Sequence, residues 1–129
     1  VSSYIMGQYS ANQLGLESTA NAGGVSNCCI SPNYSGGFKE LIKDMDRGLI
    51  VTDLMGHGVN MTTGDYSRGA SGFWVESGEI KYPVSGIVIA GNLKHMLANV
   101  VHVGDDIDPR SNIKVGATLI SEMTIAGEG

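Results

Sequence analysis

The sequence predicts an α+β domain, mainly β, in which about two amphipathic helices pack on a curved or barrel-like antiparallel sheet. Nineteen of the 129 residues are glycine and only 3 are proline, a ratio that favours short strands joined by tight turns over a disordered tail. Two segments show the apolar spacing of amphipathic helices, whereas roughly seven or eight short segments have strand character. Because 42% of the residues are hydrophobic, one core can close, and residues 1–129 are expected to form a single domain.

The first half of the chain is expected to hold a short helix, a strand and a clear amphipathic helix. Ser10 and Gly15 occupy the N-cap and C′ positions of the short helix. Residues 25–30 have the composition of a strand. Gly48 stands where the C′ glycine of the amphipathic helix is expected. The apolar residues of that helix repeat at i, i+3, i+4 and i+7: Phe38, Leu41, Ile42 and Met45.

The second half is expected to be richer in strands. Residues 49–55 form a buried-type strand that ends in a Gly-His-Gly bend. Ser77 and Gly78 join two strand-like segments as the turn of a tight hairpin, and Pro83 should end or edge its second arm. The other expected elements are the hairpin arms at residues 72–76 and 79–84, strand residues 87–90, a helix at 93–100 and strands at 115–120 and 123–126.

Charge and apolar patterning exclude two classes of partner. The formal net charge is −5 and the 8 basic residues form no run, so direct binding to nucleic acid is not expected. The apolar runs are too short to span a bilayer, and no signal segment opens the chain. We therefore expect a cytoplasmic protein without a membrane partner. Cys28 and Cys29 are adjacent, which favours two reduced thiols in a strand over a mutual disulfide.

No catalytic or metal motif can be assembled from the residues of this chain. His57, His95 and His102 lack the spacing of zinc ligands, and no Glu lies between the last two. Ser71 is one residue short of the nucleophile motif G-x-S-x-G, and no phosphate-binding loop occurs. The adjacent Asp105 and Asp106 are expected to form a solvated turn. We thus predict no catalytic residue, no metal ligand and no cofactor here.

The densest polar cluster is GHGVNMTTGDYSRG, residues 56–69. Binding residues often lie on loops whose ends are fixed by strands. The alternative is a structural turn in which Asp65 caps backbone N–H groups and pairs with Arg68, while His57 is solvated. As candidate substrate-binding residues, this cluster supplies His57, Thr63, Asp65, Tyr66 and Arg68.

The same cluster carries a family resemblance. Residues 55–84, MGHGVNMTTGDYSRGASGFWVESGEIKYPV, closely resemble the signature region of PmbA/TldE proteins in the TldD/PmbA family. The preceding LGLESTANAGG and DMDRGLIVTDL, and the following IAGNLKHMLANVVHVGDDIDPRSNIKVGATLISEMTIAG, fall in the family's order. The resemblance runs from about Gln8 onward and implies that the chain is the C-terminal region of a longer TldD/PmbA-type protein.

What the resemblance implies is one subunit of a cytoplasmic heterodimeric metallopeptidase that processes or degrades unfolded and leader peptides. In the TldD branch, zinc is held by an upstream HExxxH helix and by a Cys near the C-terminus. The corresponding residues 108–113 contain no Cys, which resembles the PmbA side. Zinc is accordingly expected in the TldD-like partner, and this chain alone is expected to be inactive.

A different class of function stays open. Older family names also mention modulation of DNA gyrase, so the chain could be a stand-alone peptide-binding or gyrase-modulating interaction protein without peptidase activity. A peptide could then join an exposed sheet edge as an added strand. The TGD of residues 63–65 is similar in both branches of the family, so it indicates membership more than activity.

Overall fold

The computed structural model describes residues 5–127. These residues form two compact units. The first unit contains the described residues up to Ile30 together with residues 109–114. The second unit contains residues 31–108 and those from Val115 onward.

The first unit is built from one helix and one pair of very short strands. Helix α1 (Gln8–Leu14) ends at Gly15, whose φ of 65° is the left-handed conformation expected of a C-cap glycine. Strand β1 (Cys28–Cys29) pairs in parallel with β6 (Ile113–Lys114). Both cysteines are free thiols, and the strand is shorter than the expected residues 25–30.

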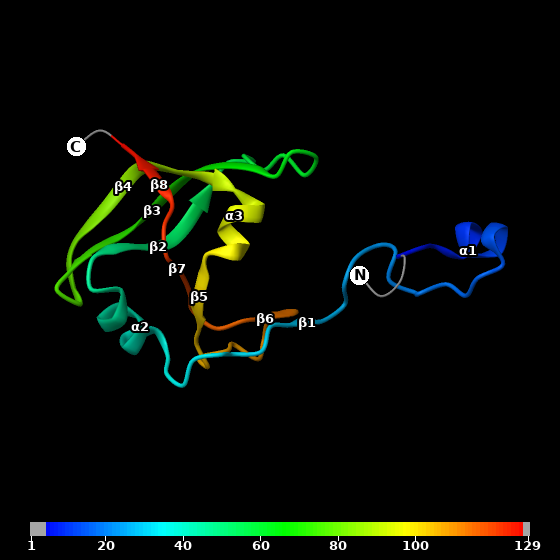
Figure 1. The fold of residues 1–129 in the computed structure, drawn as a ribbon, viewed down its shortest axis with the longest axis horizontal. Helices are drawn as coiled ribbons and strands as arrows, with labels where there is room; N and C mark the ends of the chain where they lie inside the picture. Colours follow the sequence, from blue (N-terminus) through cyan, green and yellow to red (C-terminus); the bar gives the residue numbers. More distant parts are fainter. Residues whose placement is uncertain (1–4, 128–129) are drawn as a thin grey trace. The chain divides into compact units, whose positions relative to one another are not determined.

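The second unit is dominated by an antiparallel sheet of four strands in the order β2-β3-β4-β8 (Figure 1). These strands are β2 (Gly48–Met55), β3 (Asp65–Glu76), β4 (Glu79–Asn92) and β8 (Thr124–Ala126). The predicted hairpin is confirmed, with Glu76 paired to Glu79 across a two-residue loop. Ser77 and Gly78 have φ values of 54° and 69°, the positive values that a type I′ turn requires.

Two further helices and a second antiparallel pair complete this unit. Helix α2 (Phe38–Met45) precedes β2, and α3 (Leu93–Ala98) follows β4. Strand β5 (Val100–Val103) pairs with β7 (Thr118–Ile120). The mainly β, α+β class with antiparallel sheets is confirmed.

The expectation of a barrel-like sheet was wrong in its detail, because the described sheets are open. A barrel needs its first and last strands to pair with each other. Strand β2 pairs only with β3, and the three-residue β8 pairs only with β4, at Val88, Ile89 and Ala90. Both strands therefore remain edges.

The buried core lies where α2 packs on the sheet. Ile42 of α2, Ile50 of β2 and Val75 of β3 form a buried cluster against which Met45 packs. The hairpin turn meets the end of the same helix, since Gly78 N donates to Asp46 O at 2.8 Å. These contacts fix the end of the sheet opposite to the loop that joins β2 to β3.

Candidate functional site

The loop between β2 and β3, residues 56–64, is folded by its own backbone and by one amide side chain. The Asn60 Oδ1 accepts hydrogen bonds from the backbone N–H groups of Thr62 (2.9 Å) and Thr63 (3.2 Å). The Gly64 N–H donates to the Asn60 carbonyl at 2.7 Å. Asn commonly closes turns in this way. These hydrogen bonds give the loop a defined turn conformation.

Asp65 opens β3 and links the loop to the start of α3. Its carboxylate accepts from the Thr63 hydroxyl at 2.7 Å and from the Asn92 amide at 3.3 Å. The same amide donates to the Thr63 carbonyl at 3.1 Å, while Asn92 Oδ1 accepts from Lys94 N at 3.1 Å. Thr63, Asp65 and Asn92 therefore form one network, here called the Asp65 network.

Tyr66 and Arg68 lie on the other face of β3. Successive strand residues alternate between faces, so Asp65 and Arg68 point to opposite sides. The Arg68 guanidinium donates to the Leu54 carbonyl at 3.4 Å, and its buried Nε has no partner among the described residues. No ion pair joins Asp65 to Arg68 in that part of the chain. The proposed ion pair of the structural alternative was wrong, since strand parity separates the two groups.

His57 stands apart from the other predicted residues. It lies in the Gly56-His57-Gly58 bend and is exposed, and the described residues give its imidazole no hydrogen-bond partner. Its neighbour Gly58 lies directly against β3. A Cβ atom at Gly58 would come within 1.4 Å of the Ser67 carbonyl oxygen, and Ser67 N donates to Gly58 O at 2.7 Å.

A cavity of about 340 Å³ adjoins the Asp65 network through Asn92. It offers imidazole, carboxylate and amide groups beside two methionine side chains. Of its polar members, only His95 was considered as a functional residue from the sequence, and only to exclude it as a zinc ligand. The cavity is lined by Ala90, Gly91, Asn92, His95, Met96, Asn99, Glu122, Met123 and Thr124.

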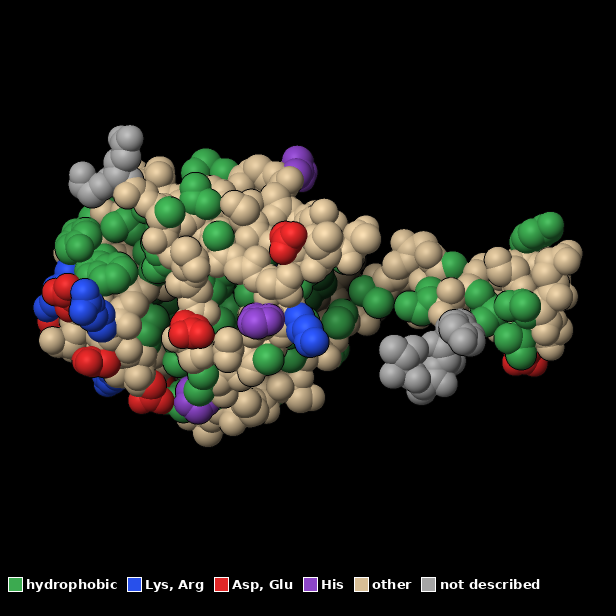
Figure 2. Space-filling model, turned by 45° about the horizontal axis from the view of Figure 1, so that its top comes forward, with side chains coloured by type: hydrophobic (Ala, Val, Ile, Leu, Met, Phe, Trp, Pro, Cys, Tyr) green, Lys and Arg blue, Asp and Glu red, His purple; other side chains and the backbone are tan. Residues whose placement is uncertain are grey.

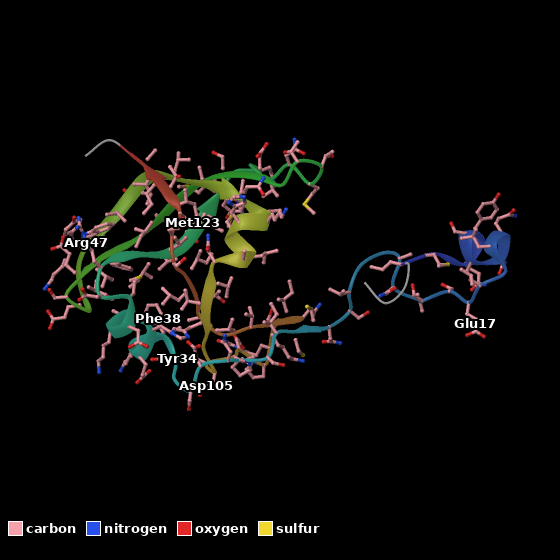
Figure 3. The ribbon with its side chains drawn as sticks, viewed as in Figure 1. Glu17, Tyr34, Phe38, Arg47, Asp105 and Met123 are labelled. Carbon is pink, nitrogen blue, oxygen red and sulfur yellow. The ribbon has the colours of Figure 1, made fainter. Side chains whose placement is uncertain are left out.

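Tyr66 instead lines a larger, mainly apolar hollow of about 880 Å³ in the second unit. Figure 3 labels Phe38 at the start of α2 and Met123 beside α3, and both contribute to its lining. The structure therefore divides the predicted site in two. Thr63 and Asp65 belong to the network beside the smaller cavity, whereas Tyr66 and Arg68 lie on the face of β3 that carries the hollow.

The described residues do not fit a metal centre. No group of three His, Cys, Asp or Glu side chains is gathered in that part of the chain. His57 lies in the loop, His95 in α3 and His102 in β5, where its ring centroid is 4.5 Å from that of Tyr34. A zinc site needs three such ligands around one point.

The surface charge is mixed. On the face drawn in Figure 2, most Lys and Arg side chains gather at one end and stand among Asp and Glu side chains. An ion pair joins Lys81 to Glu79 at 3.1 Å. Among the described residues, no helix is long and apolar enough to cross a membrane.

Comparison with known proteins identifies the family. Residues 1–127 match the model of the PmbA/TldA metallopeptidase C-terminal domain. The chain is 55% identical over 124 residues to the metalloprotease PmbA homolog of Haemophilus influenzae, covering 96% of this chain and 28% of that protein. It is 56% identical over 125 residues to metalloprotease PmbA of Escherichia coli O157:H7, covering 97% and 28%. The chain thus spans a little over a quarter of these curated relatives.

Solved structures agree with the sequence relatives. A putative modulator of DNA gyrase from Bacteroides thetaiotaomicron superposes with a TM-score of 0.85 at 27% identity, covering 98% of this chain and 28% of that one. A second protein so described, from Thermotoga maritima, gives a TM-score of 0.81 at 33% identity, with 96% and 30% covered. The chain therefore belongs to the PmbA/TldD metallopeptidase family and corresponds to its C-terminal domain.

Proposed function

We propose that this chain is the C-terminal part of the subunit without zinc in a heterodimeric PmbA/TldD metallopeptidase, which processes unfolded and leader peptides in the cytoplasm. Family membership supports a peptidase assembly. The separation of the three histidines on three elements, and the lack of Cys in residues 108–113, support zinc binding by the TldD-like partner instead. Catalysis then requires the complex.

Within that assembly, the loop of residues 56–64 and the start of β3 face the peptide. The observation that carries this proposal is the Asp65 network, which fixes a polar loop against two strands and the start of α3. Exposed polar groups on a rigid scaffold can present donors and acceptors to a peptide backbone at little cost in ordering. The side chains assigned to this role are His57, Thr63 and Asp65, with Arg68 on the opposite face of β3. Tyr66 is left out because it lines the apolar hollow.

The test uses full-length chains carrying Arg68→Ala or Asp65→Asn, each combined with a wild-type TldD-like partner. Zinc content, complex formation and cleavage of an unfolded peptide are measured separately. Cleavage is expected to fall by about tenfold or more with the complex intact. Lys81→Ala is the matched control, because its exposed ion pair with Glu79 should be worth only about 0–1 kcal/mol. Normal cleavage by both site variants would reduce the loop to a structural turn.

Metal analysis tests which of the two subunits binds zinc. The full-length chain purified without its partner is expected to hold no stoichiometric zinc after dialysis against a weak chelator, and to cleave no peptide. One equivalent of tightly bound zinc in that sample would assign metal binding to this subunit and refute the proposal.

A second candidate function is a stand-alone peptide-binding module, as the open edge of β2 would permit. That strand pairs on one side only, and an extended peptide can add to such an edge through main-chain hydrogen bonds. Copurification from native cells separates the two candidates. Recovery of a TldD-like chain supports the peptidase assembly, whereas recovery of peptides or gyrase without such a chain supports the module.

A further inference from the structure

The second unit carries an apolar hollow that its own residues leave uncovered. This surface, here called the groove, is lined mainly from α2, β2, β7 and the segment that leads into β8, with single residues from β3, β4, α3 and β5. Among its lining residues, Leu54 is 40% exposed, Ile125 45% and Phe38 42%. Its apolar lining also includes Val51, Ile50, Ile89, Met96, Val101, Leu119, Ile120 and Met123.

The chemistry of the lining defines what the groove can accept. Its charged lining residues are few, namely Asp44, Arg47 and Glu122. A phosphate or nucleotide needs converging donors and basic groups, which this lining does not supply. Aliphatic and thioether side chains instead favour aliphatic or aromatic side chains of a polypeptide, and about 25 cal/mol is gained for each Å² of apolar surface that such a contact buries.

The size of the core shows why cover is needed. The buried cluster beneath α2 consists of Ile42, Ile50 and Val75. Other large apolar side chains of the groove stay more than one third exposed, among them Val51 at 38% and Ile125 at 45%. Contiguous apolar patches of this kind on folded proteins mark contact surfaces.

We propose that the groove is the docking surface for apolar side chains from the rest of the PmbA-type chain, outside the C-terminal domain. The observation that selects this occupant is length. The match covers 28% of the PmbA relatives, so roughly seven tenths of each relative lies elsewhere in the same polypeptide. A covalently joined segment has a high effective concentration and avoids most of the entropy cost of association. The inference rests on family membership and is independent of the proposed peptidase role.

Cysteine labelling of the full-length chain tests this cover. Native cysteines, Cys28 and Cys29 included, are replaced by Ser, and single cysteines are introduced by Leu54→Cys or Ile125→Cys in the groove. Tyr82→Cys is the control, because Tyr82 is 52% exposed in the described structure and does not line the groove. Maleimide labelling is followed by mass spectrometry under native conditions at several protein concentrations, and circular dichroism checks that each variant is folded.

Same-chain cover predicts that both groove cysteines label about tenfold or more slowly than the control, at every concentration and without a partner. Labelling as fast as the control would show an open groove and overturn the proposal. Protection that appears only on adding a TldD-like chain, or only at high concentration, would assign the cover to another subunit or a second copy and also overturn it. Val51→Cys replaces Leu54→Cys if that variant does not fold. None of these readouts depends on peptide cleavage or zinc.

Discussion

The Asp106 carboxylate caps the first turn of helix α2, a role that its sequence position does not indicate. The sequence predicted a solvated turn for Asp105 and Asp106. Both residues are exposed, but the carboxylate of Asp106 also bonds two backbone groups from other parts of the chain. Its carboxylate accepts from Phe38 N at 3.2 Å and from Ala117 N at 2.9 Å. The N-cap of α2 is Gly37, which has no side chain to bond the first turn, so a residue far along the chain does so.

Replacing Asp106 with Ala is expected to lower the free energy of unfolding by about 1–2 kcal/mol, because two backbone donors lose their acceptor. Asp105→Ala is the matched control, because the Asp105 carboxylate accepts no such hydrogen bond among the described residues. This change should alter the free energy of unfolding by less than about 0.5 kcal/mol. Urea unfolding of the full-length chain measures both. Equal losses in the two variants would contradict the capping role.

Tyr34 carries the pH dependence that the structure predicts. Its pKa is raised from 10.0, first because its hydroxyl donates a hydrogen bond to the Asp44 carboxylate, then by desolvation and by the charges of Asp44 and Glu40. A raised folded pKa means that this contribution to stability is complete below the unfolded value and is lost as pH rises through the folded pKa.

Asp44→Asn should bring the pKa of Tyr34 back toward its ordinary value, since it removes one nearby negative charge and replaces a charged hydrogen-bond acceptor with a weaker neutral one. Residue-resolved NMR of the tyrosine ring carbons between about pH 8 and pH 12 would follow the change. Lys39→Gln is a suitable control on the same helix. An unchanged titration in Asp44→Asn would show that the hydrogen bond does not set this pKa.

At the scale of elements, the loop of residues 56–64 depends on close backbone contact with β3. At Gly58 a side chain has no room, because the Ser67 carbonyl oxygen occupies the place of a Cβ atom. Val59 also makes an isolated bridge with Tyr66. The loop is thus held along the first residues of β3, and the Asp65 network fixes its far end.

Gly58→Ala is therefore expected to destabilise the protein by about 1–3 kcal/mol through overpacking and to displace the loop. Gly23→Ala serves as the control, because a Cβ atom there meets nothing within 4 Å and the change should be close to neutral. Thermal unfolding gives the stability, and amide exchange in residues 56–64 reports the loop. Full protection of the loop in Gly58→Ala would argue against the close contact.

Local sequence rules predicted element centres better than their ends. Helix α2 formed where its apolar spacing predicted. It ends at Met45, with Asp46 as the C-cap residue at φ 57°, and Gly48 begins β2 instead of capping the helix. Pro83 edges β4 without ending it, because β8 pairs with that strand only farther along. The second predicted helix stops at Ala98, and the β-branched residues after it form β5.

The candidate site was predictable only where its residues are close in sequence. The polar, glycine-rich composition of residues 56–69 could be recognised from the sequence alone, and residues 56–64 do form the loop between β2 and β3. Asn92 and Asp65 are 27 residues apart and meet across a hairpin. Glu122 reaches the same region from the segment between β7 and β8. Such contacts depend on strand register, which alternation and turn residues do not determine over long distances.

Considered as a whole, the molecule is acidic and its basic side chains are accompanied by acidic ones. Eight basic residues against 13 acidic ones give a net charge of −5, and most of those visible in Figure 2 stand among acidic neighbours. Affinity for duplex DNA depends on several phosphate contacts from clustered Lys and Arg. The described surface therefore gives no support to direct DNA binding as the basis of a gyrase effect.

The full-length chain is accordingly expected to bind duplex DNA more weakly than about 100 μM at about 0.15 M salt, near the limit of non-specific binding. Fluorescence anisotropy with a labelled duplex measures this, with bovine serum albumin as an acidic control protein. Micromolar affinity that weakens steeply with added salt would show a phosphate-binding surface and remove the argument from charge.

The tight turn at Ser77 and Gly78 has a consequence for the order of folding. The first paired residues of the β3–β4 ladder, Glu76 and Glu79, are only three positions apart in the sequence. Cys28 of β1 pairs with Ile113 of β6, which lies about 85 positions later. Loop-closure entropy rises with the length of chain enclosed, so the hairpin should form early and the β1–β6 pair late. Pulse-labelled hydrogen exchange during refolding should then protect β3 and β4 amides before that of Cys28, and protection in the reverse order would rule this sequence out. During synthesis, the β1 segment would have to wait unpaired until β6 leaves the ribosome.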